Sequence, residues 1–212
     1  MHERAGNATV YLVDDDASIR AAMTRALTVE GFNVRTWATA EAFIAEYDPR
    51  EFGCLVSDVS MPGIDGLQLQ ERLSRIDRSL PIVFISGNGH VRMSVQAMRA
   101  GAVTFLEKPA RITELVEAID EGLARAERLR QQIAANASLE ERLASLTRRE
   151  RQVLQLVITG KMNKQIAAQL GAAEKTIKVH RGRVMDKMHV RSVAELVAMI
   201  ARRETLEEPM PL

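Results

Sequence analysis

Short apolar runs alternate with amphipathic segments along the first half of the chain. Short runs of apolar and β-branched residues predict strands, and five such segments cover residues 9–13, 33–36, 54–57, 81–85 and 104–106. Between these runs, apolar residues recur at helical spacing and predict helices over residues 17–30, 39–47, 66–76 and 91–100. Strands that alternate with helices form parallel sheets. We therefore expect an α/β fold with a doubly wound, five-stranded parallel sheet.

A different pattern begins after Pro109. From Ile112 onward, apolar residues recur at spacings of three and four, and no glycine or proline interrupts the chain between Gly122 and Gly160. This pattern predicts that residues 112–146 form the last helix of the sheet domain and continue into a largely helical linker. A long helix with an apolar stripe can pair with a second copy of itself, so the linker is one candidate for a dimer contact.

The C-terminal region carries only helical signals. Thr147 and Glu150 have the spacing of a capping box, and Asn163 and Ser192 are placed to cap later helices. Two of the predicted helices are joined by a short turn that contains glycine, as in a helix-turn-helix. The predicted helices cover residues 148–159, 164–170, 174–188 and 193–202.

These patterns divide the chain into four parts. A sheet domain covers residues 1–125, and a helical linker covers residues 126–146. An all-α helix-turn-helix domain follows over residues 147–203, and a tail covers residues 204–212. The tail is acidic and contains two prolines, and we expect it to be disordered.

The composition excludes several classes of protein. Of the 212 residues, 46% are hydrophobic and 27% are charged, so the chain can bury a core and is not disordered throughout. Cys54 is the one cysteine, which rules out an intrachain disulfide and a cysteine-rich zinc site. No apolar run approaches the about 20 residues that span a bilayer, and the N-terminus has no signal-peptide pattern. We expect a cytoplasmic protein without a membrane partner.

The net charge of +1 conceals a difference between two regions. Residues 147–203 contain 13 Lys and Arg against 4 Asp and Glu, a net charge of +9, whereas residues 1–146 have a net charge of −5. The basic region favours a polyanionic partner, and the alternative is a solvated basic surface. The same region contains no Phe, Trp or Tyr, which disfavours base stacking and therefore single-stranded nucleic acid.

Polar side chains follow four of the five predicted strands. Asp14 and Asp15 come after the first strand, Asp58 after the third, Ser86 after the fourth and Lys108 after the fifth. The carboxyl ends of parallel strands lie at one edge of the sheet, where grouped carboxylates prefer a hard divalent cation. One such Asp alone is more often a turn residue. The combination instead predicts phosphoryl transfer to Asp58, with charge neutralised by Mg²⁺ and Lys108.

These strand ends resemble the ordered signature of two-component receiver domains over about residues 8–125. The matching segments are Val13-Asp14-Asp15-Asp16, Asp58-Val59-Ser60-Met61-Pro62-Gly63, Ile85-Ser86-Gly87 and Phe105-Leu106-Glu107-Lys108-Pro109. The resemblance implies a flavodoxin-like fold with Asp58 as the phosphoacceptor. It implies Mg²⁺ as cofactor, bound by Asp14, Asp15, Asp58 and the backbone carbonyl of Ser60. The switch and phosphoryl-contact residues that it implies are Ser86, Phe105 and Lys108, with a cis bond from Lys108 to Pro109.

The predicted helix 174–188 has a core-facing stripe and an opposite basic face. On a helical wheel, Ile177, Val184 and Met188 form the apolar stripe. The opposite face carries Lys175, Lys178, Val179, Gly182 and Arg183. Because a basic face with little side-chain bulk suits entry into the major groove of DNA, this helix is the candidate for reading duplex DNA.

Residues 143–203 resemble LuxR-type helix-turn-helix domains. The resemblance rests on Leu146-Thr147-Arg148-Arg149-Glu150, Gly160-Lys161-Met162-Asn163-Lys164-Gln165-Ile166-Ala167, Thr176-Ile177-Lys178-Val179-His180-Arg181, Val184-Met185-Asp186-Lys187-Met188 and Arg191-Ser192. One departure is Ala173, which cannot supply an N-cap oxygen, so we expect the start of helix 174–188 to fray or to begin differently. The expected DNA-contacting residues are Lys164, Lys175, Thr176, Lys178, Val179, Arg181 and Arg183. Among them, Lys178 and Val179 are expected near bases, and Lys175, Arg181 and Arg183 near phosphates.

A receiver followed by this domain resembles the FixJ/NarL family of response regulators. The resemblance implies a transcriptional regulator that a sensor histidine kinase activates by phosphorylation of Asp58. It implies double-stranded promoter DNA and RNA polymerase as partners and a homodimer on phosphorylation. The protein would not be an enzyme beyond the self-catalysed phosphoryl transfer to Asp58.

Two alternatives assign the same residues differently. Residues 14–18 loosely match the nucleophile loop of haloacid dehalogenase-type phosphatases, which would make Asp14 the nucleophile but would leave Asp58 and the basic domain unexplained. An RNA-binding antiterminator is disfavoured by the helix-turn-helix pattern.

Overall fold

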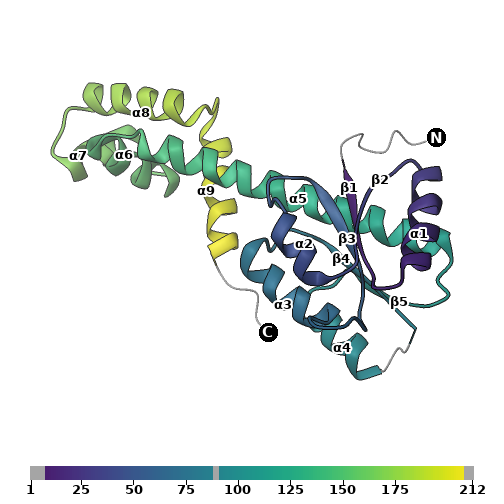
Figure 1. Cartoon of the computed structure of the whole chain (residues 1–212). Helices are drawn as coiled ribbons and strands as arrows, with labels where there is room; N and C mark the ends of the chain where they lie inside the picture. The colour runs from purple at the N-terminus through teal and green to yellow at the C-terminus, as the bar shows by residue number, and fades with distance from the viewer. Residues whose placement is uncertain (1–7, 88–90, 208–212) are drawn as a thin grey trace. The chain divides into compact units, whose positions relative to one another are not determined.

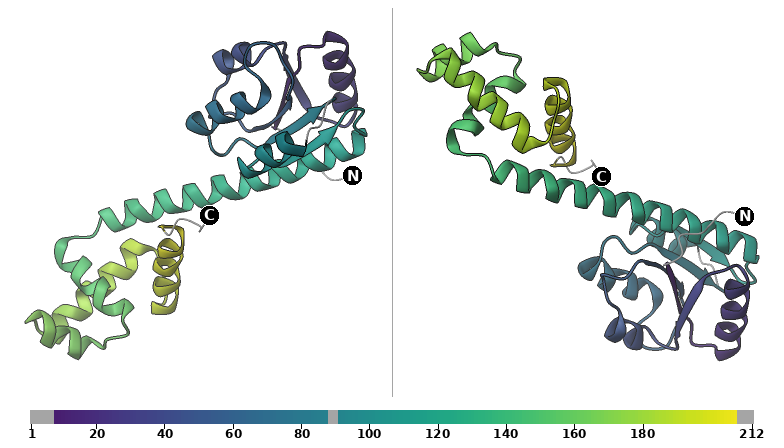
Figure 2. Two further views of the ribbon diagram at one scale, coloured as in Figure 1. Left: turned by 90° about the horizontal axis from the view of Figure 1, so that it is seen from below. Right: turned by 90° about the horizontal axis from the view of Figure 1, so that it is seen from above.

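The computed structural model describes residues 8–87 and 91–207 of the chain, which fold into two compact units that divide between Arg130 and Gln131. The boundary lies inside one continuous helix, α5 (Ile112–Ala144) (Figure 2). Within the expected linker, residues 126–130 therefore belong to the first unit and residues 131–146 to the second. Among the described residues, no helix combines the length and the apolarity that crossing a membrane requires.

The first unit is built on a five-stranded parallel sheet with the strand order β2-β1-β3-β4-β5 (Figure 1). Val13 pairs with Ser57 across β1 and β3, so the residues that follow them, Asp14 and Asp58, reach the same edge of the sheet. Each strand agrees with its predicted range to within one residue at either end. The strands are β1 (Thr9–Val13), β2 (Asn33–Trp37), β3 (Gly53–Asp58), β4 (Ile82–Ser86) and β5 (Thr104–Glu107).

Helices cover both faces of the sheet, as the doubly wound fold predicts. On one face, Tyr11 and Phe84 belong to a core cluster with residues of α2, α3 and α4. On the other face, Leu12 and Ile85 pack with residues of α1 and of the first part of α5. These helices are α1 (Ala17–Val29), α2 (Ala40–Glu46), α3 (Gly66–Ile76) and α4 (Val91–Arg99). Cys54 is fully buried, and burial raises the pKa of its thiol, which agrees with an inert core residue.

The second unit is helical, with its own core of aliphatic side chains. Leu139 and Leu146, from α5 and the turn after it, are buried there beside Val153, Ile177 and Met188. The predicted capping box opens α6, because the Glu150 backbone N–H donates to Thr147 Oγ1 at 3.3 Å and the Thr147 N–H donates to Glu150 Oε2 at 2.9 Å. The helices are α6 (Arg148–Ile158), α7 (Asn163–Leu170), α8 (Glu174–Met188) and α9 (Val193–Glu207).

Three local expectations in this unit need correction. Asn163 does not cap α7: it is the first helical residue, Met162 occupies the cap position, and the Asn163 side chain accepts from Arg181. Helix α8 begins at Glu174 although Ala173 supplies no capping side chain, so it does not begin differently, whereas fraying of its first turn stays a prediction. Helix α9 continues to Glu207, past the expected end near residue 202, because the first residue that breaks helices is Pro209. The rest of the expected disordered tail, 208–212, lies outside the described residues.

Candidate functional site

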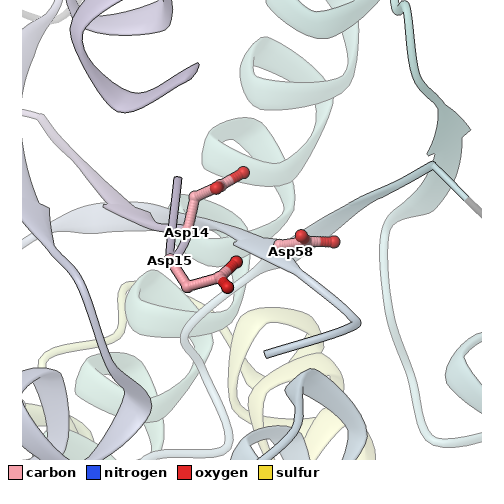
Figure 3. Close-up of side chains that lie close together, drawn as sticks. All are labelled: Asp14, Asp15 and Asp58. Carbon is pink, nitrogen blue, oxygen red and sulfur yellow. The ribbon is translucent and has the colours of Figure 1, made fainter. Parts of the chain in front are cut away.

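Three carboxylates meet at the C-terminal edge of the sheet. Asp14 and Asp15 follow β1, and Asp58 ends the neighbouring strand β3. Each residue offers an oxygen atom, and these atoms all lie within 4.8 Å of one another (Figure 3). The parallel pairing of β1 with β3 brings them together, so residues 44 positions apart share one pocket.

A lysine ammonium pairs with the two buried carboxylates. Asp14 and Asp58 are only 2% and 8% exposed. The Nζ atom of Lys108, which directly follows β5, lies 2.7 Å from Asp14 Oδ2 and 3.0 Å from Asp58 Oδ2. Partial burial acts to lower the pKa of Lys108, but its hydrogen bonds to both carboxylates raise the pKa above its ordinary value. Lys108 therefore stays protonated and compensates part of the negative charge of the pocket.

Backbone N–H groups hold the other oxygens of the buried carboxylates. Asp14 Oδ1 accepts from the Asp16 N–H at 2.9 Å, and Asp58 Oδ1 accepts from the Ser60 N–H at 3.3 Å. Asp16 itself caps α1 by accepting from the N–H groups of that helix's first turn. Asp15 is exposed and makes no hydrogen bond within the part of the chain that the structure describes. The pocket thus combines two fixed carboxylates with one that is open to a ligand.

The donor set of the pocket fits a hard divalent cation. All three acidic ligand candidates supply oxygen, which Mg²⁺ prefers. When Asp14, Asp15 and Asp58 are ionised and Lys108 is protonated, these four side chains carry two uncompensated negative charges. A divalent cation balances that excess, and no sulfur or imidazole group of the described residues joins the cluster.

The expected switch residues lie on the two strands next to Asp58. Ser86 ends β4 and is fully buried, and its carbonyl oxygen accepts from the Lys108 N–H at 2.9 Å. Phe105 on β5 is half-buried, with its ring centroid 6.4 Å from that of Phe84. The bond between Lys108 and Pro109 is cis, as the resemblance implies.

Sequence reasoning missed two residues that shape the loop after Asp58. Glu41, on α2, accepts from the Ile64 N–H at 3.1 Å and holds the loop from outside. Gly66 lies so close to the loop that a Cβ atom there would be 2.5 Å from the Asp58 carbonyl oxygen. Neither residue belongs to a local motif with Asp58, because both contacts are made only when the chain folds.

A second candidate site is the exposed face of α8. Ile177, Val184 and Met188 are fully buried, as the helical wheel predicts. A Cβ atom at Gly182 would meet nothing within 4 Å, so the backbone is open there. The exposed residues on this face of α8 and on the first turn of α7 are Lys164, Lys175, Thr176, Lys178, Val179 and Arg183.

The exposed cations of this face have no partner in the part of the chain that the structure describes. Lys164, Lys175, Lys178 and Arg183 make no side-chain hydrogen bond or ion pair among the described residues. Arg181 differs, because it is half-buried and its Nη1 atom donates to Asn163 Oδ1 at 3.0 Å. Six of the seven residues expected to contact DNA thus lie on the surface, and the seventh is bound within the unit.

Both units match known protein families. Residues 10–120 match the response regulator receiver domain, and residues 144–200 match the bacterial regulatory proteins of the luxR family. The receiver match includes Asp14 together with Asp58 and gives no support to the haloacid dehalogenase alternative. The luxR-family match likewise favours a DNA-binding domain over an RNA-binding one.

Relatives match along nearly the whole chain. Nodulation protein W of Bradyrhizobium diazoefficiens is 41% identical over 93% of this chain and 87% of its own. Transcriptional regulatory protein FixJ of the same organism is 39% identical over 94% of this chain and 97% of its own. Response regulator protein TodT of Pseudomonas putida is 38% identical over 98% of this chain and 91% of its own.

Solved structures of complete response regulators are also similar. The structure of response regulator StyR matches with a TM-score of 0.85 and 46% identity over 92% of this chain and 99% of its own. Full-length FixJ from B. japonicum matches with a TM-score of 0.58 and 38% identity over 94% of this chain and 98% of its own.

Proposed function

The chain belongs to the response regulators that join a receiver domain to a LuxR-type DNA-binding domain, and on that premise we propose that Asp58 is its phosphoacceptor. A sensor histidine kinase would donate the phosphoryl group in the cytoplasm, and the phosphorylated protein would bind promoter DNA and act on RNA polymerase. The observation that carries the proposal is the pairing of Lys108 with both buried carboxylates, Asp14 and Asp58.

Each pocket residue has a place in the transfer. An oxygen of the Asp58 carboxylate attacks phosphorus while the bond from phosphorus to the kinase imidazole nitrogen breaks, so the kinase histidine leaves with the electron pair. Lys108 and Ser86 would contact the phosphoryl oxygens. Mg²⁺, when bound, would neutralise charge on those oxygens. The residues proposed to hold it are Asp14, Asp15, Asp58 and the carbonyl of Ser60.

The mass of the intact protein tests the acceptor. Incubation with acetyl phosphate is expected to add one phosphoryl group to the wild type, and none in EDTA or in Asp58→Asn. Asp186→Asn is the matched control, because it makes the same chemical change at an exposed position of the other unit. A full adduct on Asp58→Asn, or one that forms normally in EDTA, contradicts the proposal.

We propose the exposed face of α7 and α8 as the DNA-binding surface. Its four cations have no partner among residues 8–87 and 91–207, so within that part of the protein they can contact phosphates without breaking an existing bond. Lys178 and Val179 are the residues proposed to lie near bases, and Lys175 and Arg183 near phosphates. Thr176 and Lys164 complete the surface.

The affinity of the variants for a DNA duplex tests this surface, where the duplex is one that the wild-type protein selects from a random-sequence pool. Lys178→Ala is expected to relax specificity, and Arg183→Ala to weaken binding to all sequences and lower the salt slope by about 1. Arg25→Ala, an exposed cation on α1, is the control. Unchanged affinity of both α8 variants contradicts the assignment.

We further propose that phosphorylation produces a homodimer through α4. Val91, Val95 and Met98 on this helix are 78%, 43% and 46% exposed, an apolar group that a second copy would cover. Phe105 lies on the neighbouring strand, where an inward movement would repack this surface. Sedimentation is expected to detect a dimer with beryllofluoride and a monomer without it. A dimer of equal strength in both states favours a constitutive contact through α5 instead.

A further inference from the structure

Arg181 is bound within the protein, unlike the other cations of α8. Its Nη1 atom donates to Asn163 Oδ1 at 3.0 Å, and the residue is half-buried. Lys175, Lys178 and Arg183 are exposed, and their side chains have no hydrogen-bond partner in the described part of the chain. Arg181 therefore makes a contact inside the helix-turn-helix, whereas its neighbours are open to a ligand.

The hydrogen bond joins the start of α7 to the middle of α8. Asn163 is the first residue of α7, and Arg181 lies about two turns after the start of α8. Within the described residues, it is the one hydrogen bond between a side chain of α7 and a side chain of α8. The other side-chain packing between the helices is apolar, through residues such as Ile166 and Ile177, and apolar packing has no fixed direction. The Arg181–Asn163 bond is thus the directional constraint on how α7 lies against α8.

The first turn of α7 has no capping side chain at its start, although the Met162 N–H donates to Gln165 Oε1 at 2.8 Å within the turn. Met162, at its N-cap position, accepts no hydrogen bond through its side chain. Asn163 follows with its amide oxygen directed to Arg181 instead of to the backbone of α7. Lys164 comes next and is exposed on the first turn of α7. A movement of this turn would therefore move Lys164 relative to the cations of α8.

We propose that Arg181 is a positioning residue for DNA recognition, which acts through Asn163 to hold Lys164 of α7 at a fixed separation from Lys178 of α8. DNA phosphates have a fixed spacing along the groove, and contacts to them set the register of the protein on the duplex. Two cations on different helices therefore bind together only when the helices hold the matching separation. The inference rests on the DNA-binding surface proposed above.

A salt series separates positioning from a direct phosphate contact. Full-length protein with beryllofluoride is titrated against the selected, fluorescently labelled duplex at several KCl concentrations. Arg181→Ala is expected to lower affinity about tenfold, the scale of one charge-assisted hydrogen bond. The salt slope is expected to stay unchanged, because Lys164 still makes its phosphate contact once the DNA has fixed the turn of α7. A lost phosphate contact instead lowers that slope by about 1. Arg183 is an exposed cation two residues away, and Arg183→Ala is the matched control that is expected to lower the salt slope.

A double-mutant cycle tests the route through Asn163. Asn163→Ala is expected to weaken binding as much as Arg181→Ala, and the double variant no further, because both changes remove the same bond. Circular dichroism checks that the variants keep their helix content.

Two results would overturn the inference, and they differ. If Arg181→Ala lowers the salt slope by about 1 and its effect adds to that of Asn163→Ala, then Arg181 is itself a phosphate ligand. If Lys178→Ala, Arg183→Ala and Arg181→Ala all bind like the wild type, the proposed DNA-binding surface fails, and the positioning role fails with it.

Discussion

The pocket of the first unit and the exposed face of α8 hold their charges in opposite ways. In the pocket, Lys108 is paired with Asp14 and Asp58, both buried. On α8, Lys178 and Arg183 are exposed, and no described residue pairs with them. The charges of the pocket are paired within the protein, whereas the described part of the chain leaves the cations of the α8 face unpaired.

The difference follows from what each site must bind. Burying a charge is costly unless it is paired, so a buried acidic pocket requires its own cation and a fixed geometry. Exposed cations need no internal compensation, and they gain binding energy when a polyanion releases its counterions. We therefore expect the pocket to depend on the position of each atom and the α8 face to depend on charge and salt.

The largest effect is expected in the pocket, where removal of Lys108 should slow phosphorylation of Asp58. Lys108→Ala leaves two buried carboxylates without their ammonium and removes the proposed donor to the phosphoryl oxygens. The loss of one such donor typically slows a reaction between about 100-fold and 1000-fold. The rate at which acetyl phosphate adds to Asp58, followed by intact mass, measures it. Arg111→Ala, nearby but exposed, is expected to react like the wild type. An equal rate for both variants would contradict the role of Lys108.

An ion pair in the second unit provides the next test, because it places a buried carboxylate, paired as in the pocket, beside a helix that we propose to bind DNA. Glu150 is 2% exposed, and its Oε2 atom lies 2.7 Å from Lys187 Nζ on α8. Glu150→Gln removes the ion pair and leaves Lys187 with the Ser145 carbonyl oxygen, 2.9 Å from its Nζ. It is expected to destabilise α6–α8 by about 2 kcal/mol. Hydrogen exchange of peptides from these helices measures the change. Glu141→Gln, at an exposed position of α5, is the control.

The same pair has a predictable pH dependence. The Lys187 side chain and the Thr147 N–H lower the pKa of Glu150 to about 2, from an ordinary value of 4.5. Because the pKa of the folded state lies below that of the unfolded state, the stabilisation is complete above the ordinary value and disappears as the pH falls towards 2. The difference in exchange between wild type and Glu150→Gln is expected to shrink over that range. A difference that is constant from pH 6 to about pH 3 would contradict this origin.

The sequence predicts the elements and the pocket well because both follow from local patterns and one rule of topology. Short runs of apolar and β-branched residues predict the five strands, and parallel strands bring their carboxyl ends to one edge. Asp14, Asp58, Ser86 and Lys108 follow from these two facts alone. The buried stripe of α8 follows in the same way from its periodicity.

The contacts that the sequence does not predict are those between side chains far apart in the chain. Nothing near Glu41 indicates that it accepts from the Ile64 N–H, 23 residues away. Asn163 has the chemistry of a helix cap, so local reasoning assigns it that role, whereas the folded chain offers it Arg181. The ends of helices are also hard to predict from the sequence. Helix α9 ends at Glu207, two residues before Pro209, and not near residue 202.

Alanine in place of glycine is expected to have opposite effects in the two regions. At Gly66 the new Cβ atom would lie 2.5 Å from the Asp58 carbonyl oxygen and 2.9 Å from Val59 Cα, so Gly66→Ala is expected to destabilise the first unit by about 2 kcal/mol. At Gly182 the Cβ atom meets nothing within 4 Å, so Gly182→Ala is expected to stabilise α8 by about 1 kcal/mol.

Two measurements on each variant check this contrast. Thermal unfolding gives the sign of the stability change, and binding to the selected duplex shows whether DNA approaches the backbone at residue 182. A stabilised Gly182→Ala that binds DNA more weakly agrees with close approach. If Gly66→Ala unfolds like the wild type, the loop after Asp58 is less tightly packed than the structure indicates.

The smallest expected effect comes from the start of α8, where the open DNA-binding face meets an uncapped helix. Ala173 occupies the N-cap position with an extended backbone and no oxygen to accept from the first turn. Ala173→Ser supplies that oxygen and is expected to stabilise α8 by about 0.5–1 kcal/mol. Hydrogen exchange of a peptide that covers residues 174–180 measures the gain. Ala168→Ser, at an exposed position inside α7, is the control and is expected to give no gain, because serine stabilises a helix at its cap and not in its interior. If both serines change hydrogen exchange equally, the missing cap at Ala173 does not limit the stability of this helix.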